Sequence, residues 1–76
     1  MEKETSREIY VALLDEGTGV WRPVEAVAIG NQDYRIITAN SNPDDEHWEF
    51  ATGEIVHCQE KMMSGGSIVL VAIGRA

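Results

Sequence analysis

Residues 20–29 (VWRPVEAVAI) form the longest candidate β-strand of this chain, and glycine-containing segments bound them on both sides. In an unbroken strand, Arg22 would share one face with Val24, while Trp21 would lie on the other face. Pro23 cannot donate a hydrogen bond within a sheet. We therefore predict a bulge or bend near Arg22 and Pro23, which would let this long strand serve two sheets of a small barrel.

Four further apolar segments have the composition of short strands: residues 9–14, 34–39, 54–61 and 68–73. Segments rich in Gly, Asn, Asp and Ser separate them and predict turns. Alternation along the strands predicts a set of inward-facing side chains: Tyr34, Ile36, Val56 and Cys58.

A helix-start pattern lies between the third and fourth of these strands. Asn42 suits the N-cap position and Pro43 the first helical position, and two aspartates follow where the helix dipole favours negative charge. The pattern ends within a few residues, so we predict a single helical turn. Its role would be to place Trp48 and Phe50 against the core.

Five short strands leave no room for a crossover helix, so consecutive strands are expected to pair in antiparallel fashion. Closure into a ring removes exposed sheet edges. We therefore predict an all-β fold, a small five-stranded SH3-like barrel with one short helical turn before the fourth strand; the alternative is an OB-fold. The first eight residues lack apolar periodicity, so we expect a disordered tail over residues 1–8 and a single domain over residues 9–76.

The chain carries 13 acidic and 6 basic residues, which gives a formal net charge of −7. This charge favours solubility and would repel a phosphate backbone, so nucleic-acid binding is disfavoured. The start of the chain lacks the apolar segment of an export signal, and the longest apolar run is far shorter than the about 20 residues of a membrane helix. The single cysteine cannot form an internal disulfide. We expect an acidic cytoplasmic protein without membrane contact.

The placed segments carry a resemblance to known sequences over nearly everything after residue 8. The segments that carry it are LLDEG at 13–17, VWRPVEA at 20–26, YRI at 34–36, DE at 45–46, WEF at 48–50, GEIV at 53–56 and Cys58. In these segments the chain resembles a group of small, uncharacterised bacterial proteins. The resemblance implies an SH3-like barrel in a bacterial cytoplasm, and it implies no activity.

The candidate chemical groups do not form a catalytic pattern. His57 and Cys58 are neighbours on a predicted strand, so their side chains would point to opposite faces. A free cysteine in such a position is typically a small buried hydrophobe. One cysteine and two histidines do not supply the spacing of a zinc site. We therefore predict no catalytic residue, no metal and no cofactor, and a protein that is not an enzyme.

The leading functional hypothesis is a non-enzymatic protein-interaction module that binds a protein partner or itself. An exposed tryptophan beside an arginine has the composition of a binding hot spot, and an acidic cluster could dock a basic partner. The candidate partner surface consists of Trp21, Arg22, Asp44, Asp45 and Glu46. Two alternatives stay open: an RNA-associated small β-barrel, and a metal-binding or enzymatic site built from His47, Asp44 and Asp45.

Overall fold

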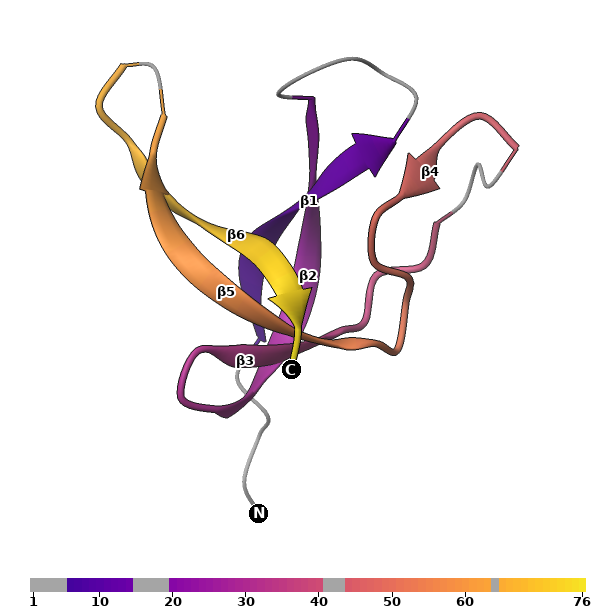
Figure 1. Ribbon diagram of the computed structural model, residues 1–76, viewed down its shortest axis with the longest axis horizontal. Coiled ribbons are helices and arrows are strands. Elements are labelled where there is room, and N and C mark those ends of the chain that lie inside the picture. Colours follow the sequence, from indigo (N-terminus) through magenta and orange to yellow (C-terminus); the bar gives the residue numbers. More distant parts are fainter. Residues whose placement is uncertain (1–5, 15–19, 41–43, 64) are drawn as a thin grey trace.

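The computed structural model describes residues 6–14, 20–40, 44–63 and 65–76. These residues form six strands: β1 (Ser6–Leu14), β2 (Trp21–Gly30), β3 (Asp33–Ile36), β4 (His47–Trp48), β5 (Ile55–Met62) and β6 (Ile68–Arg75) (Figure 1). Five of them make a ring in the order β1, β2, β3, β5, β6, which returns to β1, and β4 adds to the end of β1. The predicted all-β fold, a small barrel-like ring of five strands, is confirmed.

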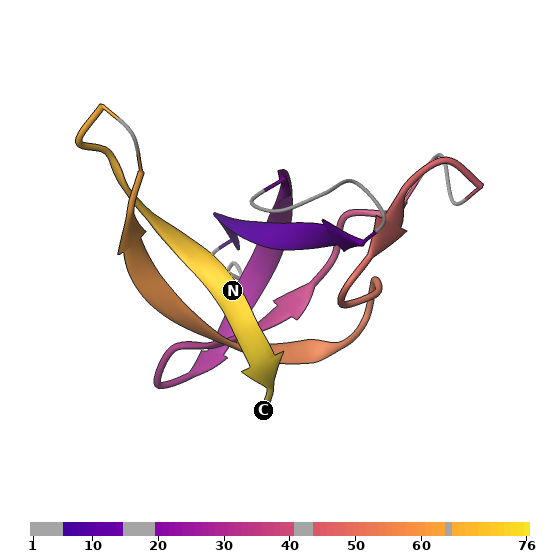
Figure 2. The ribbon, with the colours of Figure 1, turned by 45° about the horizontal axis from the view of Figure 1, so that its top comes forward.

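The ring closes through a parallel contact because its number of strands is odd. The four pairings β1–β2, β2–β3, β3–β5 and β5–β6 are antiparallel. Strand direction therefore alternates, and the fifth strand runs the same way as the first. β6 and β1 accordingly pair in parallel, through a single bridge between Tyr10 and Val71. Beyond this point the two strands separate, as Figure 2 shows.

β2 pairs with β1 along its first part and with β3 along its last part, so it serves both halves of the ring as predicted. The predicted bulge near Arg22 and Pro23 is wrong. The β1–β2 register passes both residues without a shift, and the irregularity lies between Ala28 and Gly30, where β2 meets β3. Arg22 is exposed although Val24 on the same face of β2 is buried, and its guanidinium forms an ion pair with Glu46.

Eleven buried residues from five strands and the β3–β5 connection form one hydrophobic core: Ile9, Val11, Val24, Ala26, Tyr34, Ile36, Phe50, Val56, Cys58, Leu70 and Ala72. The inward-facing positions predicted on the third and fourth long strands are all among them. Trp48 is partly buried and packs against this cluster. The predicted contact of Trp48 and Phe50 with the core is therefore confirmed.

The predicted helical turn does not occur in residues 44–53. Asp44 and Asp45 form a turn, and the two-residue strand β4 begins after Glu46; Asn42 and Pro43 lie outside the described residues. A single helical turn gains few hydrogen bonds for the backbone it fixes. The end of β1 offers backbone partners to an extended chain, and β4 pairs with it there. Among the described residues, no helix is long and apolar enough to cross a membrane.

The folded domain begins closer to the N-terminus than the predicted boundary at residue 9. β1 begins at Ser6, so residues 6–8 belong to the sheet. They pair with β2 because that strand is ten residues long, and its residue Val27 lies opposite Ser6. Residues 1–5, the rest of the predicted tail, lie outside the described residues.

Candidate functional site

The chain leaves the ring after β3 and returns at β5, and we call the described part of this connection, residues 37–40 and 44–54, the excursion. Hydrogen bonds within the excursion and to the ring hold it in place. The Thr52 hydroxyl donates a hydrogen bond of 2.6 Å to the Thr38 carbonyl, which closes the base of the excursion. The backbone N–H of Glu49 donates to a carbonyl of β1 at 2.9 Å. The excursion is therefore held in one position beside the ring (Figure 1).

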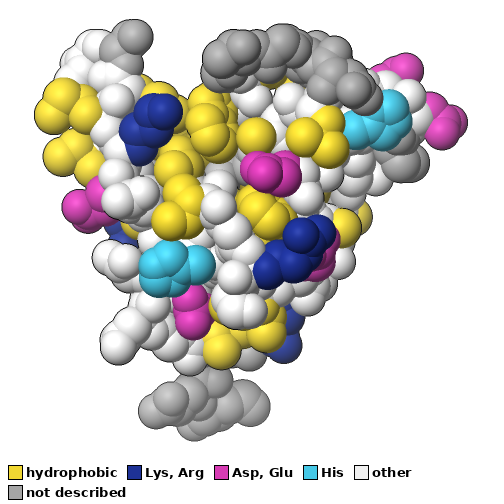
Figure 3. All heavy atoms as spheres, viewed as in Figure 1, with side chains coloured by type: hydrophobic (Ala, Val, Ile, Leu, Met, Phe, Trp, Pro, Cys, Tyr) yellow, Lys and Arg dark blue, Asp and Glu magenta, His cyan; other side chains and the backbone are white. Residues whose placement is uncertain are grey.

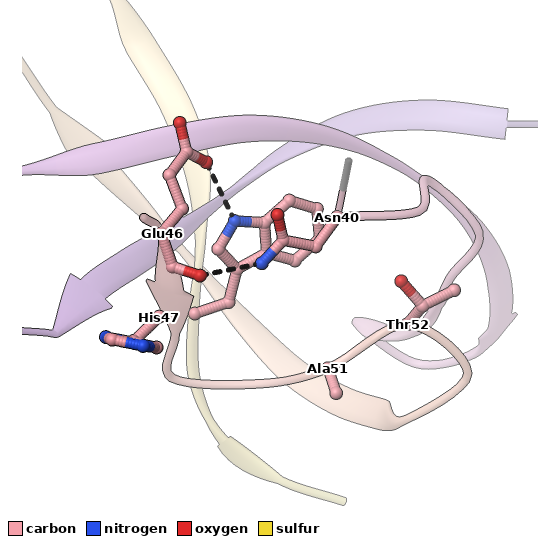
Figure 4. Close-up of a pocket in the computed structure, with 6 residues that line it drawn as sticks. Asn40, Glu46, His47, Ala51 and Thr52 are labelled. Atoms are coloured by element: carbon pink, nitrogen blue, oxygen red, sulfur yellow. Dashed lines mark hydrogen bonds between the residues drawn. The ribbon is translucent and has the colours of Figure 1, made fainter. Parts of the chain in front are cut away.

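A shallow pocket of about 440 Å³ lies within the excursion. The residues that line it are Asn40, Glu46, His47, Trp48, Ala51 and Thr52. Asn40 donates a side-chain hydrogen bond of 2.8 Å to the Glu46 carbonyl oxygen, which joins the two arms of the excursion across the pocket (Figure 4). The pocket thus has both polar and apolar walls, with a tryptophan among them.

Glu46 organises this pocket through its carboxylate. Arg22 donates to both carboxylate oxygens, through Nε at 3.0 Å and through a terminal nitrogen. The indole N–H of Trp48 donates to Glu46 Oε1 at 3.0 Å. The hydrogen bond from Arg22, followed by that from Trp48, lowers the pKa of Glu46 below its ordinary value, and Glu46 raises the pKa of Arg22. The carboxylate therefore stays ionised at neutral pH, and it fixes the tryptophan that lines the pocket.

Acidic residues lie next to the pocket-lining residues in the chain. Asp44 and Asp45 precede Glu46 in the chain, are exposed, and make no ion pair with any described residue. Glu49 is also exposed and likewise lacks a cationic partner among the described residues. Figure 3 shows acidic side chains at the outer end of this part of the molecule. A tryptophan and carboxylates without a described cationic partner, carried by the same excursion, favour a positively charged group.

The five residues of the predicted partner surface divide into two groups. Arg22 and Glu46 meet in the ion pair, and Asp44 and Asp45 lie next to it in the chain. Trp21 points to the opposite face of β2 from Arg22, where the Lys61 ammonium lies 5.4 Å from the centroid of its ring. Trp21 is half-buried and lies outside the core cluster. Trp21 therefore belongs to a different surface.

The histidine and cysteine of β5 lie on opposite faces, as predicted. His57 Nδ1 is 2.9 Å from Asp33 Oδ1, within hydrogen-bond distance. Cys58 is fully buried in the core. Burial, with a smaller contribution from the charge of Asp33, raises the pKa of the Cys58 thiol to about 11. The thiol is therefore protonated at neutral pH, and a protonated, buried thiol is a poor nucleophile.

The metal-site alternative finds no supporting geometry in the described residues. No group of three or more His, Cys, Asp or Glu side chains comes together there as a possible metal site. His47, Asp44 and Asp45 are close in sequence, and the structure does not gather them as ligands.

Three residues that line the pocket were not predicted in any role: Asn40, Ala51 and Thr52. They come from the two arms of one long connection, and no spacing in the sequence indicates that these arms meet. The one local signal was Trp48, which was predicted as a core residue. It packs on the core and lines the pocket at the same time.

In comparisons with protein families, curated proteins and solved structures, no match to this chain was found. The resemblance to small bacterial proteins with an SH3-like barrel therefore stays a prediction.

Proposed function

We propose that this protein is a non-enzymatic protein-interaction module, and that its pocket receives a positively charged segment of a partner protein. One observation carries the proposal: a half-buried tryptophan lines a pocket of about 440 Å³, and two exposed aspartates without a described cationic partner directly precede the pocket-lining Glu46 in the chain. An aromatic face attracts Lys or Arg, and the carboxylates add charge complementarity.

The ion pair inside the site supports the proposal through pre-organisation. Glu46 is held by Arg22 and itself holds the indole of Trp48, so little side-chain freedom of the indole is left to lose on binding. Asp44 and Asp45 keep their charge available for the partner. The net charge of −7 acts in the same direction, because it raises the rate of encounter with a basic segment.

The test uses the tryptophan of the pocket as its reporter. The chain has two tryptophans, so Trp21→Phe leaves Trp48 as the only fluorophore of this kind. The probes are three sets of peptides of equal length and apolar content, with positive, zero and negative net charge. We expect only the positive peptides to shift the fluorescence of Trp48. Equal responses to all three sets, or none, would contradict the proposal.

A pair of double variants separates the pocket from the overall charge. Asp44→Asn with Asp45→Asn removes the two exposed charges that directly precede Glu46 and have no described ion pair. Glu8→Gln with Glu60→Gln makes the same change in net charge at exposed positions on β1 and β5. At about 0.5–1 kcal/mol for each exposed charge, we expect the first variant to bind about fivefold to thirtyfold more weakly and the second to change little. Equal losses would show that only net charge matters.

A further inference from the structure

The β5–β6 hairpin extends beyond the ring, and we call its outer part, residues 59–63 and 65–70, the arm. β3 pairs only with Ile55, Val56 and His57 of β5, and β1 meets β6 only at Val71. Figures 1 and 2 show the end of the hairpin standing apart from the other strands, on the side of the molecule opposite the excursion. Within the described residues, each strand of the arm therefore has its neighbour in the hairpin as its only pairing partner.

The arm exposes apolar side chains. Met62 and Ile68 are opposite one another in the hairpin and are 67% and 62% exposed. Figure 3 shows hydrophobic side chains at the surface of this lobe, next to a basic one. An isolated two-stranded hairpin is only marginally stable in water. A further contact would therefore stabilise the arm, and its exposed apolar side chains provide a surface for it.

One edge of the arm lacks the features that usually block strand addition. Natural sheet edges are protected by charged residues, proline, bulges or very short strands. The open edge of β5 carries Glu60 and Lys61, that of β1 carries Arg7 and Glu8, and β4 has only two residues. The edge formed by Ser67 and the first three residues of β6 (SIVL, 67–70) has no charge and no proline, and the register shift of this strand lies at its other end.

We infer that this edge of β6 pairs with the same edge of a second copy of the chain, in antiparallel fashion about a two-fold axis near Val69. A two-fold contact uses one surface twice, so it requires a surface that does not repel itself. With a net charge of −7, most contacts between copies bring carboxylates together, and residues 67–70 bring none. In this arrangement Ile68 lies opposite Leu70 of the second copy, and the hairpins of the two copies form one four-stranded sheet.

The size of the contact sets its strength. Stable interfaces bury about 1,200–2,000 Å² in total, and four residues of paired edge with two exposed apolar side chains from each copy fall below this range. The dimer is therefore weak, with a dissociation constant of about 0.1–1 mM, and it forms at high local concentration. This contact lies on a different surface from the pocket, so a test of the dimer is independent of a test of the proposed function.

The test is sedimentation equilibrium of the full chain from about 10 µM to 1 mM. The main variant is Ile68→Lys, which places like charges beside the two-fold axis, and the matched control is Ile73→Lys, at a residue of the same strand that is 51% exposed. We expect the unmodified chain and the control to dimerise and Ile68→Lys to weaken the dimer at least tenfold. Circular dichroism verifies that both variants are folded.

A second measurement needs no variant. In a mixture of isotope-labelled and unlabelled protein, the antiparallel pairing predicts nuclear Overhauser contacts between the β6 strands of different molecules around Val69. A chain that stays monomeric up to 1 mM overturns the inference and leaves this edge to an extended segment of another protein. A dimer that Ile68→Lys and Ile73→Lys weaken equally, or that lacks these contacts, overturns the assignment to β6.

Discussion

The strand register of β3 can be tested with two neighbouring isoleucines. Ile36, the last residue of β3, is 1% exposed in the core, whereas Ile37, which follows it, is 45% exposed. Ile→Val removes one methylene-sized group at either position and keeps the β-branched shape. Because adjacent residues of an extended chain face opposite sides, the two substitutions differ only in the face that they change.

The magnitude follows from burial. Ile→Val in a packed core costs about 0.5–1.5 kcal/mol, and at an exposed position about 0.5 kcal/mol or less. A domain of 76 residues has a free energy of unfolding of about 4–11 kcal/mol. Ile36→Val therefore leaves a folded protein whose loss of stability is measurable. Ile36→Ala, at about 2–5 kcal/mol, could remove most of the stability at the low end of that range.

The assay is urea unfolding followed by circular dichroism. With a slope of about 1 kcal/mol per M for a chain of this size, Ile36→Val lowers the midpoint by about 0.5–1.5 M. Ile37→Val leaves the midpoint nearly unchanged, and both variants keep the wild-type slope. A larger effect at Ile37 than at Ile36 would mean that β3 is displaced by one residue, which would exchange its core and solvent faces and refute the register described above.

Two further predictions concern titratable groups. Because Cys58 is fully buried and its pKa is raised to about 11, we expect a thiol reagent at pH 8 to react only at the rate of unfolding, and fast labelling of the native protein would contradict the burial. Cys58→Ser buries an unpaired hydroxyl, so we expect it to lower the free energy of unfolding in urea by about 1–3 kcal/mol. A hydrogen bond from the Ala51 N–H and a weaker effect of Arg75 lower the pKa of Glu54 below its ordinary value of 4.5. The ionised Glu54 carboxylate therefore stabilises the fold above pH 4.5, and this stabilisation is lost as the pH falls through the lower folded-state pKa. Unfolding at pH 6 and pH 3 should therefore show a smaller acid-induced loss for Glu54→Gln than for the wild type or the exposed control Glu60→Gln, and equal losses would contradict this role.

The sequence was sufficient for the parts of the fold that depend on local pattern. Strict alternation places Tyr34 and Ile36 in the core, and the same rule separates His57 from Cys58. Turn-forming segments identified the long strands. These features survive in the structure because each side chain contributes to the choice of face independently of distant residues.

The errors arose where a distant residue decides the outcome. The bulge at Arg22 was predicted because an arginine on the inward face lacks a partner within its own strand, and Glu46, 24 residues away, supplies that partner. The helical turn was predicted from local signals, and pairing of β4 with the end of β1 replaced it. The pocket was not predicted because Asn40 and Glu46 meet only through the path of the whole excursion.

The distribution of the core limits where function can lie in so small a chain. Eleven buried residues form the core, and all of them are apolar, aromatic or a protonated cysteine. A domain of this size has little stability to spare, so replacing any of them with a reactive polar group would cost a large part of it. Recognition is therefore expected in the segments that leave the ring. The excursion offers a pocket whose lining residue Glu46 is held by Arg22, and the arm offers an uncharged strand edge on the opposite side. The two surfaces differ in chemistry and lie apart, so a partner bound at the pocket would leave the arm accessible. A weak dimer formed through the arm would then present two pockets to a partner with repeated basic segments.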